Sequence, residues 1–212
     1  IQHWPKLRLW HNGGESPYVT ESLRRLGISP EQLLPACDHL QATMLLVPNF
    51  AAHFGRPSTA NLQWLEQFWA APKQPGQNTL WMGREGAARR AVLEEIQHRQ
   101  TCGAGLLGQG SVSKQLDQIA ASHRVIAPHG AAMANLIAAH PGTEILELVN
   151  PAYQPGYFND LIKHRQLRHR RLEAAATPLP LQELLYEGPL SFPIDLRPGA
   201  SPAAEALASW LP

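Results

Sequence analysis

The feature of this sequence that most constrains its fold is a regular alternation of short apolar runs with amphipathic stretches between residues 79 and 149. The apolar runs have the length of strands, and the stretches between them carry apolar residues at helical spacing. A helix between two strands returns the chain to the same edge of the sheet, so successive strands run parallel. The sequence therefore predicts an α/β fold, a Rossmann-like parallel sheet with helices on both faces.

The individual elements are expected between the turn and cap residues that interrupt this pattern. Strands are predicted at Lys6–Trp10, Thr43–Val47, Thr79–Gly83, Ala104–Leu107, Arg124–Ala127, Glu144–Val149 and, as a basic edge strand, Leu167–Leu172. Helices are predicted from Ser16 to Gly27 and at Ser58–Ala71, Ala87–Gln100, Ser113–Ser122, Ala131–Ala139 and Pro155–His164. We expect one Rossmann-like domain over residues 1–172 and a Pro/Ala-rich extension over 173–212 that packs on it or trails from it.

Charge and cysteine content narrow the classes of function. The chain has 18 basic and 17 acidic residues, so no global positive field favours nucleic acid, and a bound anion needs a local set of donors. The basic run His164–Arg171 is interpreted as a solvated edge or an interface. Cys37 and Cys102 form no CxxC pattern, which argues against a disulfide framework or a zinc site and favours a reducing compartment.

The sequence shows no sign of membrane insertion. No apolar run reaches the roughly 18 residues of a membrane span, and no signal-peptide pattern opens the chain. We therefore expect no transmembrane segment and a location that is cytoplasmic or peripheral to a membrane. The sequence begins at Ile1 rather than at a methionine, and we expect the chain to be a segment of a longer polypeptide.

The most informative stretch is VIAPHGAAMAN at Val125–Asn135, where an apolar strand runs through Pro-His-Gly into a helix. At the carboxyl end of a parallel strand, such a junction lies where open α/β sheets bind ligands. The first N–H groups of the helix suit a phosphate, and Gly130 and Ala131 allow a ligand to approach the backbone closely. His129 adds an imidazole donor. The alternative is a tight strand-to-helix turn with a packed histidine.

Arginines follow the strand LWMGR. Arg84 ends this strand and projects from the same edge as His129 if the two strands are neighbours. Its guanidinium can then clamp a diphosphate through two parallel hydrogen bonds. Arg89 and Arg90 are explained more simply as the solvated face of the next helix.

An acidic residue, Glu147, lies with Asn150 at the end of the strand EILEL. A carboxylate at such a strand end can accept hydrogen bonds from ribose hydroxyls. The alternative is an edge-strand glutamate that faces water.

Two familiar ligand motifs are weak or absent. Gly103, Gly105 and Gly108 spell GxGxxG, but a predicted helix precedes them and Ala104–Leu107 is itself the expected strand, so we interpret the match as accidental. The aspartates form no Asp-x-Asp pair, so we expect no carboxylate-held metal on a nucleotide.

Taken together, these residues resemble glycosyltransferase family 61, which includes bacterial capsular-polysaccharide enzymes, plant xylosyltransferases and the EGF-domain O-GlcNAc transferase. The matching positions are Trp81-Met82-Gly83-Arg84, Arg90, Gln115, His129-Gly130-Ala131 with Asn135, and Pro141-Gly142-Thr143 with Glu147-Leu148. The resemblance covers roughly residues 6 to 172 and is specific around 79–148. Trp81, Lys114, Ala132 and Met133 depart from the residues usual in the family.

The resemblance implies the donor-binding C-terminal half of a GT-B-like, inverting, metal-independent enzyme that acts in capsular or cell-surface polysaccharide synthesis. It implies a nucleotide-sugar donor, most simply a UDP-sugar, a glycan acceptor, and no further cofactor. The donor-binding residues would be Arg84, Arg90, Gln115, His129, Gly130, Ala131, Asn135 and Glu147. Arg84 and the helix start would hold the diphosphate, Glu147 would lie near the ribose or sugar, and His129 is a candidate general base. An acceptor-binding N-terminal region would be missing from this segment.

Two other functions remain open at this point. A non-catalytic module would bind a nucleotide or a partner protein without turnover. An NAD-dependent oxidoreductase would use the GxGxxG stretch and depend on Gly105 rather than Arg84.

Overall fold

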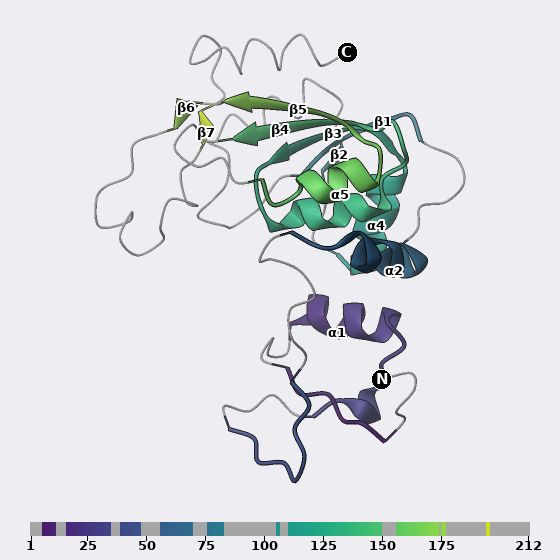
Figure 1. Cartoon of the computed structure of the whole chain (residues 1–212). Helices are drawn as coiled ribbons and strands as arrows, with labels where there is room; N and C mark the ends of the chain where they lie inside the picture. The colour runs from purple at the N-terminus through teal and green to yellow at the C-terminus, as the bar shows by residue number, and fades with distance from the viewer. Residues whose placement is uncertain are drawn as a thin grey trace.

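The centre of the structure is a five-stranded sheet in which neighbouring strands are parallel (Figure 1). The structure is a computed structural model that describes residues 6–11, 16–34, 39–47, 56–69, 76–82, 105–106, 110–149, 156–173, 175–176 and 194–195. The strands in sheet order are β2 (Gly105–Leu106), β1 (Asn78–Trp81), β3 (Ser122–Pro128), β4 (Glu144–Val149) and β5 (Arg168–Glu173). This sheet confirms the predicted α/β class, and β5 is its basic edge strand as expected.

The described helices of the α/β layer lie on one face of the sheet (Figure 1). They contact one another and are α2 (Thr59–Trp69), α4 (Val112–Ala120), the 3-10 helix η2 (Ala131–Ala138) and α5 (Asn159–His164). The helix expected at Ala87–Gln100 lies outside the described residues. Helices are therefore described on one of the two predicted faces.

The hydrophobic core lies between this helical layer and the sheet. Leu80, Val125 and Ile145 face it from three neighbouring strands, and all are buried. The residues that alternate with these point to the other face of the sheet, and two of them, Ile126 and Leu146, are also completely buried. Both faces of the central strands are therefore covered, which explains why these strands are apolar along their whole length.

Two helices of the layer owe their form to local sequence. Ser111 caps α4, because its hydroxyl accepts a hydrogen bond from the N–H of Lys114 at 3.2 Å. η2 is helical where a helix was predicted, but it is wound as a 3-10 helix. Its fully buried residues Met133 and Leu136, with Ala139 at the end, recur every three positions, which is the period of a 3-10 helix.

Charged side chains join α2 to α5 at the edge of the layer. Glu66 of α2 lies 3.0 Å from Nε2 of His164 and forms an ion pair with Arg165. The Arg165 guanidinium also donates to the carbonyl of Ala139 at 2.6 Å, which ties the end of η2 to the same group. Burial lowers the pKa of Arg165.

The N-terminal part contains the helix that the Ser-Pro and Gly signals predicted, but not the predicted strands. Helix α1 (Pro17–Arg25) is followed by Gly27 at a φ of 78°, a left-handed conformation that suits glycine. A short 3-10 helix, η1 (Pro30–Gln32), comes next. Near the start of the chain, only an isolated bridge joins Leu9 to Leu33 where the strand Lys6–Trp10 was expected.

The strand predicted at Thr43–Val47 is wrong. Residues 39–47 adopt no regular structure, and Met44 and Val47 are 79% and 77% exposed. An apolar run becomes a strand only where another strand satisfies its backbone groups and covers its side chains. In the described part of the chain no strand does so for this run.

The extension beyond the sheet is described only in part. β6 (Ala175–Ala176) pairs antiparallel with β7 (Ile194–Asp195). The remaining residues predicted to form the Pro/Ala-rich extension lie outside the described residues.

In the portion of the chain that is described, no helix is long and apolar enough to cross a membrane.

Candidate ligand site at the carboxyl edge of the sheet

The strand order β2-β1-β3-β4-β5 places a topological switch point between β1 and β3. From β1 the chain moves outward to β2, and it then crosses over β1 to continue in the opposite direction through β3. In α/β proteins with this kind of strand order, ligands bind at the carboxyl ends of the strands beside the switch point. The His129-Gly130-Ala131 junction follows β3 at this point.

The two strands that were expected to share this edge are neighbours. β1 and β3 pair over Leu80↔Val125 and Trp81↔Ile126. This pairing satisfies the condition under which Arg84 and His129 were predicted to lie at one edge. Arg84 itself lies outside the described residues, as do Arg90 and Asn150.

The backbone of the junction is held by the next strand. The N–H of His129 donates to the carbonyl of Leu148 at 2.8 Å. Gly130 is buried and extended, and the 3-10 helix starts directly after it at Ala131, which is exposed. The first N–H groups of a helix have no acceptor within the helix, so this start can present donors to an anion.

Beneath the junction lies Glu147, whose side chain is completely buried. Its Oε1 lies 2.5 Å from Nδ1 of His129. Its Oε2 accepts from Nε2 of His169 at 2.7 Å and from Nε of Arg171 at 2.8 Å. The carboxylate therefore has three protein donors, and the alternative of an edge glutamate facing water is wrong.

These contacts make Glu147 a stable anion. Burial alone would raise the pKa of Glu147, but hydrogen bonds from His129, His169 and Arg171, with the charge of Arg171, lower it to about 2. An ionised carboxylate only accepts hydrogen bonds, so each histidine must present an N–H to it. Nδ1 of His129 and Nε2 of His169 therefore carry hydrogens.

The register of the strands explains why these side chains meet. Glu147 lies opposite Ala127 on β3 and opposite Arg171 on β5. His129 is two residues beyond Ala127, and His169 is two residues before Arg171. Alternate residues of a strand share a face, so all four polar side chains project from the same face of the sheet.

Two aromatic rings lie beside His129 at the same edge. The ring centroids of Phe158 and Tyr157 are 5.6 and 6.3 Å from that of the imidazole. Both residues belong to the segment between β4 and α5, which leaves the carboxyl edge of the sheet. They form an apolar wall beside the imidazole.

Gln115 and Asn135, which were predicted as donor-binding residues, meet each other. Nδ2 of the buried Asn135 donates to Oε1 of Gln115 at 3.1 Å. Nε2 of Gln115 donates to the carbonyl of Gly110 at 3.2 Å. The pair thus joins the start of α4 to η2 and supports the helix that follows the junction.

The structure assembles part of the predicted set and adds residues to it. It brings His129, Gly130, Ala131 and Glu147 together, and it places Gln115 with Asn135. His169 and Arg171 were not predicted as site residues, because the run HRQLRHRR was interpreted as a solvated edge or an interface. The available signal was the i, i+2 spacing of the two residues in a strand next to that of Glu147.

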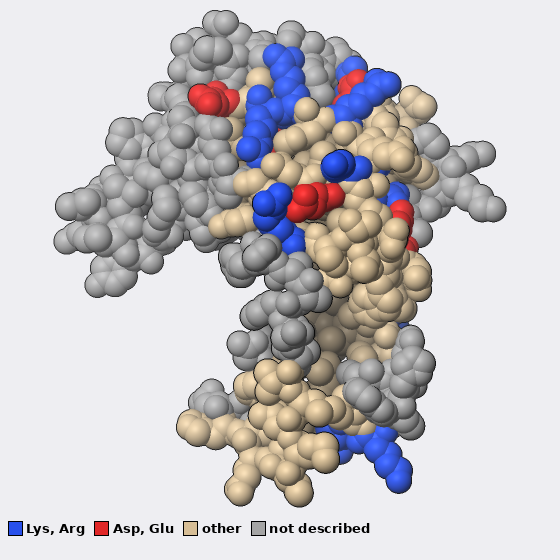
Figure 2. Space-filling model, viewed as in Figure 1, with Lys and Arg blue, Asp and Glu red and all other residues tan. Residues whose placement is uncertain are grey.

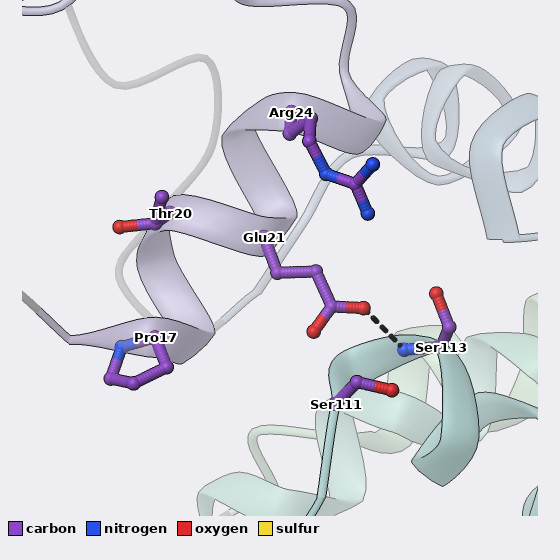
Figure 3. Close-up of a pocket in the computed structure, with 6 residues that line it drawn as sticks. All are labelled: Pro17, Thr20, Glu21, Arg24, Ser111 and Ser113. Atoms are coloured by element: carbon purple, nitrogen blue, oxygen red, sulfur yellow. Dashed lines mark hydrogen bonds between the residues drawn. The ribbon is translucent and has the colours of Figure 1, made fainter. Parts of the chain in front are cut away.

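A second polar contact lies at the start of α4 and involves α1. Glu21 of α1 accepts from the backbone N–H group of Val112 at 2.6 Å. It also accepts from that of Ser113 at 2.8 Å, the contact drawn in Figure 3. Burial would raise the pKa of Glu21, but these hydrogen bonds and the charge of Arg24 lower it. Arg25 donates to Oγ of Ser113 at 2.6 Å. A shallow pocket beside this contact is lined by Pro17, Thr20, Glu21, Arg24, Ser111 and Ser113.

The outer surface near β5 is basic. Figure 2 shows blue side chains gathered over the sheet half of the described surface, with acidic side chains interspersed. Lys163, Arg168 and Arg170 are the exposed basic residues of α5 and β5. Among the described residues, no group of three or more His, Cys, Asp and Glu side chains could hold a metal ion.

The GxGxxG stretch does not have the structure of a dinucleotide fingerprint at its described position. Gly105 lies within β2, whereas the middle glycine of a fingerprint belongs to the turn after a strand. Gly103 and Gly108 lie outside the described residues.

Comparison of the chain with protein-family models and with curated proteins gives no match. The resemblance to family 61 therefore rests on the motif residues themselves.

Proposed function

We propose that this chain is the donor-binding domain of a family 61-like glycosyltransferase. The enzyme transfers a sugar, with inversion and without a metal, from a nucleotide-sugar such as a UDP-sugar to a glycan acceptor of the cell surface. It works in the cytoplasm or at the membrane periphery. The observation that carries the proposal is the position of the His129-Gly130-Ala131 junction at the topological switch point, with Glu147 buried behind it.

The site offers what a diphosphate needs when no metal is present. The start of η2 supplies N–H groups, His129 supplies an imidazole at the same point, and Arg84 follows the neighbouring strand β1. Preorganised donors of this kind stabilise the charge that develops on a leaving diphosphate. The buried Glu147 fixes the imidazole ring, as the carboxylates behind functional histidines commonly do.

The geometry favours a supporting role for Glu147 over the direct contact with ribose or sugar that the resemblance implied. Both carboxylate oxygens accept hydrogen bonds from protein groups, and the side chain is completely buried. In this proposal Glu147 orients His129, and the ligand meets the imidazole. His129 and Arg84 remain the residues proposed to act on the reacting groups.

Calorimetric titration of the chain with UDP, GDP, CMP and NAD tests the proposal. We expect one nucleoside phosphate to bind, EDTA to have no effect, and Arg84→Ala and His129→Ala to weaken binding at least tenfold. Arg170→Ala, which removes an exposed cation of β5, is the matched control and should bind normally. Binding of NAD alone would support the oxidoreductase instead. Nucleotide binding by a parent protein that transfers no sugar would support a non-catalytic module.

A further inference from the structure

We infer that His169 and Arg171 of β5 are positioning residues of the ligand site, which act on the bound nucleotide through Glu147 and His129 rather than by touching it. The site then depends on a chain of contacts across three neighbouring strands, β3, β4 and β5. The inference rests on the proposed function, since it concerns the way in which the same site holds its nucleotide.

The main chain of His129 is fixed, but its backbone does not fix the orientation of the imidazole ring. The N–H of His129 donates to the carbonyl of Leu148 at 2.8 Å, which holds the main chain. The last side-chain torsion of a histidine has broad minima, so the ring can turn. The contact of 2.5 Å between Nδ1 of His129 and Oε1 of Glu147 is therefore the hydrogen bond that selects one orientation.

The carboxylate of Glu147 has the same kind of freedom, since its last torsion is also broad. Its Oε2 accepts from Nε2 of His169 at 2.7 Å and from Nε of Arg171 at 2.8 Å. Two donors on one oxygen fix the plane of the carboxylate and leave Oε1 directed at His129. The orientation of the imidazole is thus determined from β5.

Arg171 also keeps Glu147 in the form that can accept. Burial would raise the pKa of Glu147, whereas the hydrogen bonds from His129 and His169, and the hydrogen bond and charge of Arg171, lower it. A carboxyl group that gains a proton loses part of its capacity to accept hydrogen bonds. Loss of Arg171 therefore weakens the acceptor that holds the ring of His129.

A double-mutant cycle tests this path of action. Calorimetric titration with UDP at pH 7 compares the native chain, Arg171→Met, His129→Ala and the double variant. We expect Arg171→Met to raise the Kd of UDP about three- to tenfold, because residues of one hydrogen-bond network are coupled by energies of this order. In the His129→Ala background the same change should alter the Kd by less than about twofold, since the ring that Arg171 positions is absent.

Further variants separate the hydrogen bonds from charge and stability. Arg171→Lys keeps the charge and a donor and should recover most of the affinity, whereas His169→Phe keeps a ring without the N–H and should weaken binding. Arg170→Met removes the same kind of side chain from an exposed neighbour and should bind UDP normally. Gly76→Ala introduces a clash with the carbonyl of Ala121 at the opposite end of the sheet and should also bind normally.

A measurement without nucleotide examines the ring itself. In 1H–15N correlation spectra, the Nδ1 hydrogen of His129 should resonate far downfield and exchange slowly with water, because it lies in a short contact with a buried carboxylate. His129→Ala assigns this signal by removing it. Exchange should become faster in Arg171→Met and in His169→Phe, and it should be unchanged in Arg170→Met.

The outcomes distinguish the inference from the proposed function. Equal losses of affinity on Arg171→Met with and without His129 overturn the inference, because Arg171 then acts on the nucleotide directly or through the whole fold. Unchanged exchange of the Nδ1 hydrogen in the β5 variants overturns it as well, and this result decides if His129→Ala binds UDP too weakly for the cycle. If Arg171→Met does not fold, His169→Phe takes its place in both measurements. In each of these cases the proposed function stands, whereas a native chain that binds none of UDP, GDP and CMP overturns the proposed function and the inference with it.

Discussion

Oε1 of Glu147 lies 2.5 Å from Nδ1 of His129, although the two residues are on different strands and 18 positions apart. This contact determines which imidazole nitrogen carries hydrogen, and it joins the β3 junction to the interior of the sheet. Several measurable properties of the chain follow from it and from the contacts around it.

Acid should destabilise the chain through Glu147. Its folded pKa is about 2 against an ordinary value of 4.5, so its contribution is complete above about pH 4.5 and is lost as the pH falls toward 2. The shift corresponds to about 3 kcal/mol of unfolding free energy. Urea unfolding at pH 6, 4 and 3 measures this loss. The difference between native chain and Glu147→Gln should shrink across that range, and a constant difference would contradict the assignment.

Removal of Arg171 should destabilise the fold more than removal of its neighbour. Arg171→Gln deletes the full positive charge beside a completely buried carboxylate, and we expect a loss of about 2 kcal/mol. Arg170→Gln alters an exposed residue of the same strand and should change stability by less than about 0.5 kcal/mol. Chemical denaturation of both variants at pH 7 provides the comparison. Equal losses would mean that Arg171 does not support Glu147.

Glu21 should hold α1 against α4. Glu21→Gln removes a charged acceptor from two backbone N–H groups at a helix start, and we expect a loss of about 1 kcal/mol. Hydrogen exchange should become faster in α1 and at Val112 and Ser113, with little change in β3 and β4. Asp117→Asn, which removes the charge of an exposed carboxylate on α4, is the control. Unchanged exchange in α1 would show that other contacts hold it.

Gly76 should tolerate no side chain. A Cβ at this position would lie within 1.7 Å of the carbonyl oxygen of Ala121, a backbone atom that cannot move independently of β3. Gly76→Ala should therefore cost at least about 2 kcal/mol. Gly110→Ala meets only the flexible side chain of Lys114 and should be mild. The melting temperatures of Gly76→Ala and Gly110→Ala provide the test. Similar values for the two variants would contradict the close approach of Gly76 to Ala121.

Much of the α/β core was predictable because each of its elements carries its own signal. Apolar runs marked β3 and β4, and the Ser-Pro and Gly boundaries marked α1. The predicted strand at Thr43–Val47 failed for the converse reason. Its apolar run satisfies the local pattern, but a strand also needs a partner, and the identity of the partner is a property of the whole fold.

The candidate site was predictable as a location but not as a set of contacts. His129 and Glu147 were each placed at strand ends, yet their hydrogen bond depends on the register between β3 and β4, which a single sequence does not reveal. His169 and Arg171 were hidden in a basic run that also contains Arg168 and Arg170. Only the pairing of β5 with β4 separates the residues that face the site from those that face outward.

That separation along β5 has a consequence for how copies of the chain behave together. β5 is the outermost strand on its side of the described sheet, and such a strand can pair with the same strand of another molecule. Arg168 and Arg170 are exposed along it, so two copies that approached edge to edge would bring like charges together. The alternate residues of one short strand thus support the carboxylate behind the imidazole on one face and place positive charge on the other, which disfavours pairing between the β5 edges of two copies.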